Sequence, residues 1–242
     1  MKISVIIPTY NKGKIISKTL EETEKVLNDL GLEHEIIVVD DGSTDNTFEE
    51  AKKLSNYFPD INVVHYMPNG GKGKALRHGF KYVSGDLVLF LDADLDLHPR
   101  QIKTFLEYME KTNADIVIGS KRHPDSRVIY PSQRRFLSKG YQMFTSFFLK
   151  LPVSDTQVGM KLLKREVLDR IFPKILVKKW AFDVELLVNA IHHGYKVVEA
   201  PVDLNFQRFG SAVNLKTIPN MFIDTCAIFY RLRILRYYTK PS

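Results

Sequence analysis

The sequence has 242 residues but only one cysteine and no long apolar run. The single cysteine, Cys226, excludes a disulfide within the chain and is typical of a reducing compartment. No run of about 18 apolar residues occurs, so no helix is expected to span a bilayer. The first residues, MKISVIIPTYNKG, lack the length and flanks of a secretory signal. The composition, 44% hydrophobic and 26% charged, is otherwise that of an ordinary globular protein.

Acidic residues are scarce in two segments. Residues 121–150 contain seven Lys or Arg and one acid, and residues 208–242 contain six and one. The whole chain carries +7, so subtracting the +6 and +5 of these segments leaves −4 for the rest. This distribution suggests an anionic partner that binds at one place. Nucleic acid is not expected as that partner, because the basic segments carry no recognisable nucleic-acid-binding motif.

Strand and helix patterns alternate over the first 120 residues. Such alternation predicts an α/β fold, with a mostly parallel sheet flanked by helices. The predicted strands cover residues 3–10, 34–43 (ending in a turn), 61–66, 86–93 and 114–120. The predicted helices between them cover residues 14–30, 44–57, 72–83 and 99–111.

The alternation stops near residue 120. A loop is predicted first, followed by helices, two further strands and a helical tail. The loop covers residues 121–132, the helices 133–151 and 182–194, a strand followed by a helix 158–172, the last strand 195–202 and the tail 214–238. We therefore expect one domain over residues 1–212 and a basic amphipathic helical extension over residues 213–242.

Three polar strand ends should meet at one edge of the sheet. They are Pro8–Asn11, Asp40–Ser43 and Asp92–Asp96, and ligands of open α/β sheets bind beyond such carboxyl ends. In the last of them, Asp92, Asp94 and Asp96 follow a buried apolar run, where their repulsion costs free energy unless a cation offsets it. Oxygen ligands favour Mg²⁺ or Mn²⁺. The alternative is a charged strand end in which Asp96 caps the next helix.

The stretch NGGKGKALRHG, residues 69–79, resembles a glycine-rich helix start that can receive an anion. It is not a P-loop, because Gly73 stands where that motif needs Ser or Thr. Nor is it a dinucleotide fingerprint, because Leu76 stands where that motif needs Gly or Ala. A flexible connection before an amphipathic helix is the alternative interpretation.

The motifs together resemble a known family. SVIIPTYN (4–11), VVDDGSTD (38–45), GGKGKALRHG (70–79) and LDADLD (91–96) resemble the nucleotide-sugar-binding half of a family 2 glycosyltransferase with the GT-A fold. GSKRH (119–123), RRFLSKG (134–140), DTQVGMKLLKREV (155–167) and WAFDVELL (180–187) resemble the polyprenyl-phosphate sugar transferases. The last two stretches are most similar to dolichyl-phosphate β-glucosyltransferases, and dolichyl-phosphate mannosyltransferases share most of the rest. The resemblance covers roughly residues 3–212.

The resemblance implies an inverting, metal-dependent transfer of a hexose from UDP-glucose or GDP-mannose to a polyprenyl (dolichyl) phosphate. The implied nucleotide-sugar-binding residues are Pro8, Tyr10, Asn11, Asp40, Asp41, Lys72 and Asp92. The implied ligands of Mg²⁺ or Mn²⁺ are Asp92, Asp94 and Asp96. The implied acceptor-phosphate contacts are Lys121, Arg122, Arg134 and Ser138. The implied catalytic residues are Asp94, Arg134, Ser138 and Asp155.

Two other functions are left open. A related enzyme could add the sugar to a saccharide hydroxyl, which would need a general base, with Asp155 or Asp183 as the candidates. The alternative roles are a helix cap for Asp183 and a turn residue for Asp155. A non-catalytic subunit could bind a nucleotide sugar for a partner. Two departures from the family pattern bear on this: Lys12 stands where the family usually has an acid, and Ala212 stands where a lysine is expected, with Arg208 nearby as a substitute.

Two segments combine aromatic and basic residues. They are QMFTSFFLKL (142–151) and IFYRLRILRYY (228–238). Such segments can lie on a membrane surface with their arginines at lipid phosphates, and the alternatives are core helices or a contact in a homodimer. We therefore expect a cytoplasmic protein, peripheral on the cytoplasmic face of a membrane.

Overall fold

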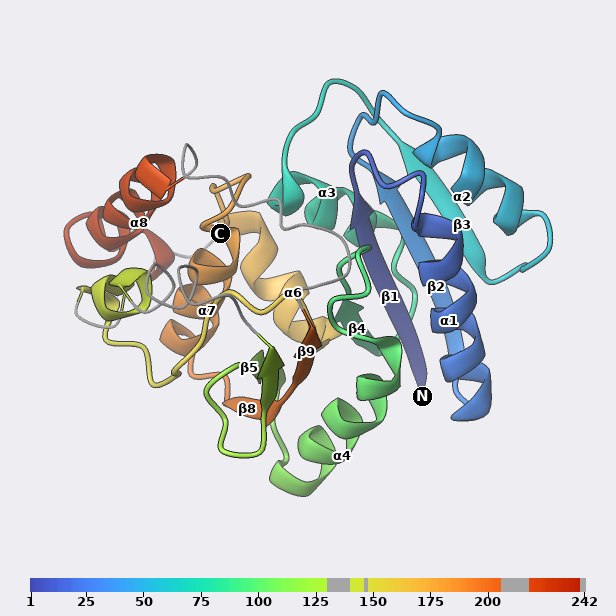
Figure 1. Ribbon diagram of the computed structural model, residues 1–242. Helices are drawn as coiled ribbons and strands as arrows, with labels where there is room; N and C mark the ends of the chain where they lie inside the picture. Colours follow the sequence, from blue (N-terminus) through green and yellow to red (C-terminus); the bar gives the residue numbers. More distant parts are fainter. Residues whose placement is uncertain (130–139, 146–147, 206–217, 240–242) are drawn as a thin grey trace.

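The computed structural model describes residues 1–129, 140–145, 148–205 and 218–239. Its centre is a seven-stranded sheet with helices on both faces, which confirms the predicted fold class (Figure 1). In sheet order the strands are β3 (Ile61–His65), β2 (Glu33–Asp40), β1 (Lys2–Thr9), β4 (Leu87–Phe90), β7 (Lys161–Lys164), β5 (Ile116–Ser120) and β8 (Val197–Pro201). All of them run parallel except β7, which is antiparallel to β4 and β5. A parallel pair, β6 (Arg127–Ile129) and β9 (Asp203–Asn205), forms a second, small sheet.

The helices follow the strands as the sequence pattern predicts. They are α1 (Ile16–Asp29), α2 (Thr47–Ser55), α3 (Lys72–Gly79), α4 (Ile102–Thr112), α6 (Arg165–Ile171), α7 (Phe182–His192) and α8 (Ile218–Arg233). Residues 140–145 and 148–149 are also helical, and the remainder of the helix predicted over 133–151 lies outside the described residues or ends before residue 150. Short 3₁₀ turns cover Phe80–Tyr82, Pro99–Gln101, Phe172–Lys174 and Tyr237–Thr239.

Two apolar cores lie on opposite faces of the sheet. On β1, Ile6 points into the core under α3, α6 and α7, whereas Val5 and Ile7 point into the core under α1, α2 and α4. These side chains are fully buried, and each contributes about 1.5–3 kcal/mol by leaving water. Because both faces are covered, the central strands are mostly apolar, and polar residues follow where β1, β2 and β4 end.

The described part of the tail packs on this body rather than extending from it. Helix α8 contacts α7, and it buries Met221, Thr225 and Ile228. Beyond it, Tyr238 is completely buried. Helix α8 lies at the opposite end of the molecule from β3 and α2 (Figure 1). No helix in the described residues is long and apolar enough to cross a membrane.

Candidate active site

The ends of β1 and β2 are joined by hydrogen bonds between the loops that follow them. Asn11 has a left-handed backbone (φ 52°), which turns its amide toward Ser43 Oγ at 2.9 Å. Its side-chain Oδ1 accepts from the Thr44 amide at 2.8 Å. Tyr10, just before it, is 45% exposed. The two predicted polar strand ends are therefore adjacent, and the side chain of Tyr10 beside them is open to solvent.

Two buried aspartates shape the wall of this edge. Asp40 accepts from Ser43 and from His65 Nδ1, the latter at 2.7 Å. Asp41 accepts from the amides of Gly70 and Gly71 at 2.7 Å each, and from Asn69 Nδ2 at 2.9 Å. Both carboxylates are thus engaged within the protein. The glycine-rich stretch is held in place by Asp41, directly before α3.

The carboxylate cluster after β4 is paired with lysine. Lys72 Nζ, at the start of α3, lies 2.7 Å from Asp92 Oδ1, and both side chains are partly exposed. Burial acts to raise the pKa of Asp92, but Lys72 outweighs it and holds the pKa below its ordinary value. Burial and the charge of Asp92 together raise the pKa of Asp94, although Lys12 acts to lower it. Asp94 also accepts from the Asp96 amide at 3.2 Å.

The loop before β7 reaches the same cluster from the second half of the chain. A Cβ at Gly159 would stand 1.8 Å from Asp92 Oδ2, so only glycine fits against this carboxylate. Two residues further on, Lys161 is completely buried, donates to the Val158 carbonyl and lies 2.8 Å from Asp183 Oδ1. Burial lowers the pKa of Lys161, against the opposing effect of Asp183. The Lys72–Asp92 and Lys161–Asp183 ion pairs therefore lie side by side at this edge of the sheet.

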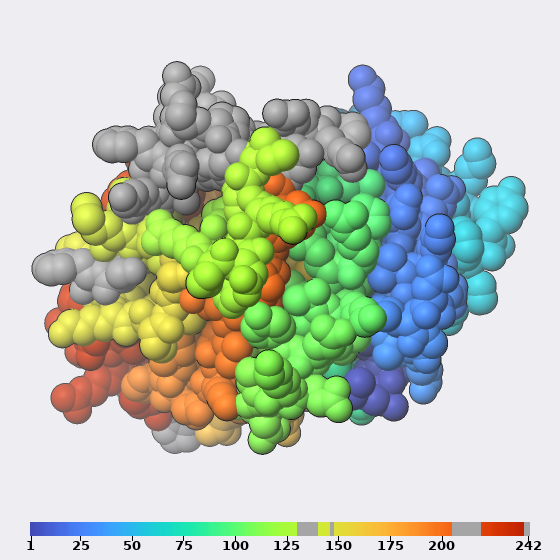
Figure 2. All heavy atoms as spheres, turned by 60° about the horizontal axis from the view of Figure 1, so that its bottom comes forward, coloured from blue at the N-terminus to red at the C-terminus, as the bar shows by residue number. Residues whose placement is uncertain are grey.

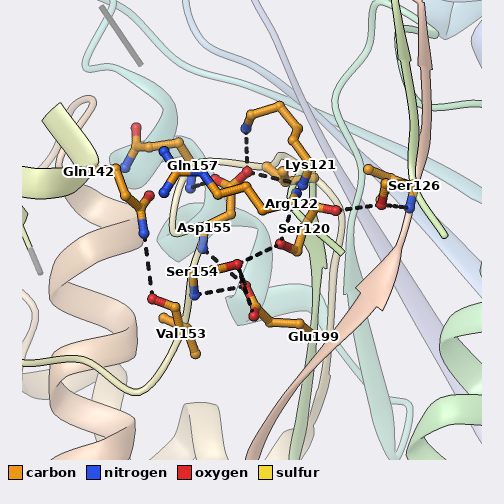
Figure 3. Close-up of polar contacts among 12 residues, drawn as sticks. Ser120, Lys121, Arg122, Ser126, Gln142, Val153, Ser154, Asp155, Gln157 and Glu199 are labelled. Carbon is orange, nitrogen blue, oxygen red and sulfur yellow. Dashed lines mark hydrogen bonds and ion pairs between the residues drawn. The ribbon is translucent and has the colours of Figure 1, made fainter. Parts of the chain in front are cut away.

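A second polar cluster lies at the end of β5 (Figure 3). Buried Asp155 accepts from the Lys121 amide at 3.1 Å and forms an ion pair with Lys121 Nζ at 2.7 Å. Glu199 of β8 accepts from the Ser154 and Asp155 amides at 2.9 and 3.0 Å. These contacts fix the start of the basic segment, in which Arg122 remains exposed. Residues 121–129 are visible at the surface, yellow-green in Figure 2.

This arrangement combines an acidic strand edge, a glycine-rich helix start and a basic segment on one sheet. Residues 4–172 match the family described as Glycosyl transferase family 2. The chain belongs to this family. It is therefore an enzyme, a glycosyltransferase of the hexosyltransferase kind.

Individual relatives of this glycosyltransferase cover most of its length. Dolichyl-phosphate beta-glucosyltransferase ALG5A of Trichomonas vaginalis is 34% identical over 244 residues, which cover 95% of this chain and 74% of the relative. Glucosyl-3-phosphoglycerate synthase of Mycobacterium tuberculosis, solved with Mn²⁺, UDP-glucose and phosphoglyceric acid, aligns with a TM-score of 0.71 at 19% identity over 100% of this chain and 81% of that one. Mannosyl-3-phosphoglycerate synthase of Rubrobacter xylanophilus aligns with a TM-score of 0.73 at 21% identity, over 96% and 74%. The two structures share the glycosyltransferase fold.

The predicted site residues of the glycosyltransferase fall into three groups. Those at the strand edge lie at the ends of β1, β2 and β4 and at the start of α3; they are Pro8, Tyr10, Asn11, Asp40, Asp41, Lys72, Asp92, Asp94 and Asp96. Those at the second polar cluster are Lys121, Arg122 and Asp155. Arg134 and Ser138, together with Arg208 and Ala212, lie outside the described residues.

Sequence reasoning missed two residues that the glycosyltransferase places beneath the site. Lys161 and Gly159 stand in the apolar stretch VGMKLLK, and neither was a candidate. A lysine flanked by Met160 and Leu162 in a buried strand was the available signal, because a buried ammonium group needs a counter-ion close by. The sequence indicates Asp183, the partner of Lys161, only as a candidate general base or helix cap.

Proposed function

We propose that this glycosyltransferase moves a hexose from a nucleotide diphosphate sugar, with inversion, to a polyprenyl (dolichyl) phosphate. Three findings support the proposal: the family, the similarity to a dolichyl-phosphate beta-glucosyltransferase, and the acidic edge next to a basic segment. A solved structure of the same fold contains UDP-glucose with Mn²⁺. UDP-glucose is therefore the first donor to test, and GDP-mannose the second.

One observation favours a phosphate acceptor over a saccharide hydroxyl. A hydroxyl acceptor needs a general base to take its proton, whereas a phosphate oxygen is already anionic at neutral pH. The two candidate bases, Asp155 and Asp183, are both buried and both ion-paired with a lysine, at 2.7 and 2.8 Å. Each of these carboxylates is thus already engaged by a lysine of the protein. In this proposal Asp155 positions Lys121 for the acceptor rather than accepting a proton.

The residues of the edge fit a divalent metal ion. Burial and the charge of Asp92 raise the pKa of Asp94, so a further positive charge beside these two carboxylates would be favourable. Lys72 already supplies one such charge to Asp92. Within the described residues, Asp92, Asp94 and Asp96 do not bring one oxygen each within 4.8 Å of one another. Binding of Mg²⁺ or Mn²⁺ by one or two carboxylates, completed by phosphate oxygens and water, fits this arrangement. The ion would be held by Asp94 and Asp92, with Asp96 next to them, and it would offset the charge on the departing diphosphate.

The remaining edge residues would hold the donor. Tyr10 offers an exposed ring to the base, in a loop that Asn11 and Asp40 hold in shape through Ser43. Pro8 would line the same pocket. Asp41 would act through the glycine-rich loop, whose helix start and Lys72 face the diphosphate.

The basic segment would hold the acceptor. Arg122 is exposed and can pair with a phosphate through its planar fork, and Lys121 adds a second positive charge beside it. Arg134 and Ser138 complete the proposed phosphate contacts. Together these groups position the acceptor oxygen and shield its charge from that of the donor, so that in-line attack at the anomeric carbon inverts its configuration.

We also propose that the segment 213–242 lies on an anionic membrane surface. One face of α8 is buried on α7, whereas the other exposes Ile223 and Tyr230, which are 66% and 51% exposed. Ile234, directly after the end of α8, is 63% exposed. Arg233 and Arg236 are exposed beside these side chains. An apolar stripe flanked by arginines is the pattern of a helix that lies in a membrane interface.

The test of the activity is transfer of radiolabelled hexose to a short polyprenyl phosphate. We expect label from UDP-glucose or GDP-mannose in an organic-phase, acid-labile product, formed with Mn²⁺ or Mg²⁺ and suppressed by EDTA. Label that entered only a water-soluble saccharide would instead support the hydroxyl acceptor. Full activity in the presence of EDTA would show that the transfer does not require a divalent metal ion.

Two variants test the proposed roles of Asp94 and Arg122, and a third variant serves as the control. Asp94→Asn should lower kcat by about a hundredfold to a thousandfold, in the range of other losses of transition-state charge stabilisation. Arg122→Gln should raise the KM for polyprenyl phosphate and leave UDP binding unchanged. Asp125→Asn is the matched control, because its side chain is 76% exposed in the same basic segment. An Arg122→Gln variant with an unchanged KM would exclude Arg122 from acceptor binding.

The membrane contact is tested separately by flotation with anionic liposomes. The variant Ile223→Ser/Tyr230→Ser/Ile234→Ser changes only exposed side chains, whereas truncation of the tail would also remove buried Ile228 and Tyr238. We expect the wild type to float and this variant to sediment. Equal flotation of the wild type and the variant would show that the exposed face of α8 does not bind the membrane.

A further inference from the structure

A cluster of ligand atoms lies at the other end of the sheet from the active site. Glu24 of α1, His34 near the start of β2 and Asp60 just before β3 each offer a ligand atom, and these atoms lie within 4.8 Å of one another. Asp40 is six residues beyond His34 on β2, about 20 Å away at the usual rise of a strand. The cluster is thus separate from the carboxylates that follow β4.

The hydrogen bonds of His34 determine which nitrogen carries its proton. Nδ1 lies 2.8 Å from the Leu32 carbonyl, which can only accept, so Nδ1 is the donor. In a neutral ring, Nε2 then presents a lone pair to Glu24 Oε2 at 3.2 Å, which is also an acceptor. Both side chains are more than nine-tenths buried. A proton on one of the two groups, or a metal ion, must therefore lie between these two acceptors.

The surroundings of the pair favour a metal ion. Asn28 Nδ2 donates to Glu24 Oε1 at 3.1 Å, and this leaves Oε2 directed at His34. The carbonyl behind His34 and the amide behind Glu24 orient both groups as the second shell of a metal site commonly does. Asp60 adds a second carboxylate, which a single proton between the other two would not use. Because Asp60 is exposed, water can complete the coordination.

We propose that Glu24, His34 and Asp60 form a second divalent metal site, which ties α1 to the starts of β2 and β3. One imidazole nitrogen and two carboxylates suit Zn²⁺ or a similar first-row ion, and two carboxylates balance its charge. Ligands at about 2.0–2.2 Å from Zn²⁺ can stand at most about 4.4 Å apart, close to the 4.8 Å within which these atoms lie. The exposed Asp60 can adjust its position by side-chain rotation.

Calorimetric titration with ZnCl₂ tests the site in the full-length chain. The parent for this experiment carries Asp94→Asn, which removes a carboxylate of the other proposed metal site. We expect one strong Zn²⁺ site in this parent, and a rise in Tm of about 5–10 °C at a Zn²⁺ concentration a hundredfold above Kd. His34→Gln and Asp60→Asn should each weaken binding by about tenfold or more.

Two controls distinguish Zn²⁺ binding at this cluster from binding elsewhere on the chain. His192→Gln removes an exposed histidine far from the cluster and should leave the affinity unchanged. If His34→Gln does not fold, the Zn²⁺ affinity of Asp60→Asn tests the site instead, because this substitution changes only an exposed side chain. The absence of Zn²⁺ binding in the parent, or equal affinity in Asp60→Asn, would overturn the proposal and leave a proton between Glu24 and His34. Asp60→Asn in the wild-type background should transfer hexose normally, so a failure here is distinct from a failure of the proposed function.

Discussion

Buried carboxylates are held differently in the two halves of the molecule. In the first 120 residues, buried Asp40 and Asp41 and half-buried Glu35 accept mainly from backbone amides and hydroxyl groups. Cations near carboxylates of this half include Lys2 at Glu35 and, when protonated, His65 at Asp40 and His34 at buried Glu24. In the second half Asp155, Asp183 and Glu185 are each paired with lysine or arginine. A hydrogen bond from a neutral donor to a charged carboxylate adds about 1.5–3 kcal/mol. Removing one partner of a buried ion pair costs about 3–5 kcal/mol, because it leaves an uncompensated charge. The second half should therefore be more sensitive to single substitutions.

The largest loss of stability is expected at Glu185, which is completely buried on α7. Its carboxylate accepts from the amides of Leu176 and Val177, from the Tyr238 hydroxyl and from Arg231, at 2.6–2.9 Å. Glu185→Ala leaves these four donors without their acceptor. We expect the free energy of unfolding to fall by about 4–5 kcal/mol in urea titrations. Glu166→Ala, on the exposed face of α6, is the control. An equally small fall in the free energy of unfolding for both variants would contradict the expected sensitivity of the second half.

A somewhat smaller effect is expected from Lys161→Met. The variant leaves Asp183 buried without its counter-ion, at a cost of about 3 kcal/mol. Lys164 provides a matched control on the same strand, because it pairs with Asp115 at the same kind of distance, 2.7 Å, but both side chains are partly exposed. Lys164→Met should cost about 1 kcal/mol or less.

A double-mutant cycle sharpens the same comparison. Lys161→Met/Asp183→Leu removes both charges and should be more stable than Lys161→Met alone, because no buried charge remains. Additive losses in the double variant would show that packing, rather than the ion pair, determines the cost.

The same comparison explains what sequence reasoning could predict. Each site element of the first half is continuous in sequence: an apolar run ends, and its polar residues follow within a few positions, as at Asp40 and Asp92. Because β1, β2 and β4 are parallel, these ends meet at one edge without further information. The alternation of strands and helices was sufficient to place them.

In the second half the decisive contacts join residues far apart in sequence. Tyr238 and Glu185 are 53 residues apart, and Lys161 and Asp183 belong to different elements. The antiparallel direction of β7 was not predicted either, since an apolar run such as that of Lys161–Lys164 reads the same in both directions. Residue type can indicate that a buried lysine such as Lys161 needs a counter-ion, but it does not identify the partner. Only the positions of the elements in space bring the two residues together.

A moderate effect is expected from Asp41→Asn in the first half. The amide has one oxygen where the carboxylate has two, and its NH₂ group would face a backbone donor of the glycine-rich loop. We expect a loss of about 1–3 kcal/mol, and faster hydrogen exchange at the amides of Gly70 and Gly71. Asp29→Asn, exposed at the end of α1, should change neither. Unchanged exchange at both glycines would show that the loop keeps its shape without the carboxylate.

The smallest effect is expected from Glu35→Gln, and it depends on pH. Burial acts to raise the pKa of Glu35, but hydrogen bonds from Ser4 and Ser84 outweigh it and hold the pKa below its ordinary value of 4.5. The stability that the carboxylate provides is therefore present above pH 4.5, and it is lost as pH falls through the lower pKa of the folded state. Glu35→Gln should be less stable than the wild type by about 1 kcal/mol at pH 7.

Because the wild type loses this contribution in acid and the variant has no carboxyl group to titrate, their stabilities should converge on acidification. Urea titrations at pH 7 and at pH 3 measure both differences, with the exposed Glu33→Gln on the same strand as the control. A constant difference between Glu35→Gln and the wild type over this range would mean that the hydrogen bonds of the first half favour the charged and neutral forms equally. The difference in sensitivity between the two halves would then depend on burial alone.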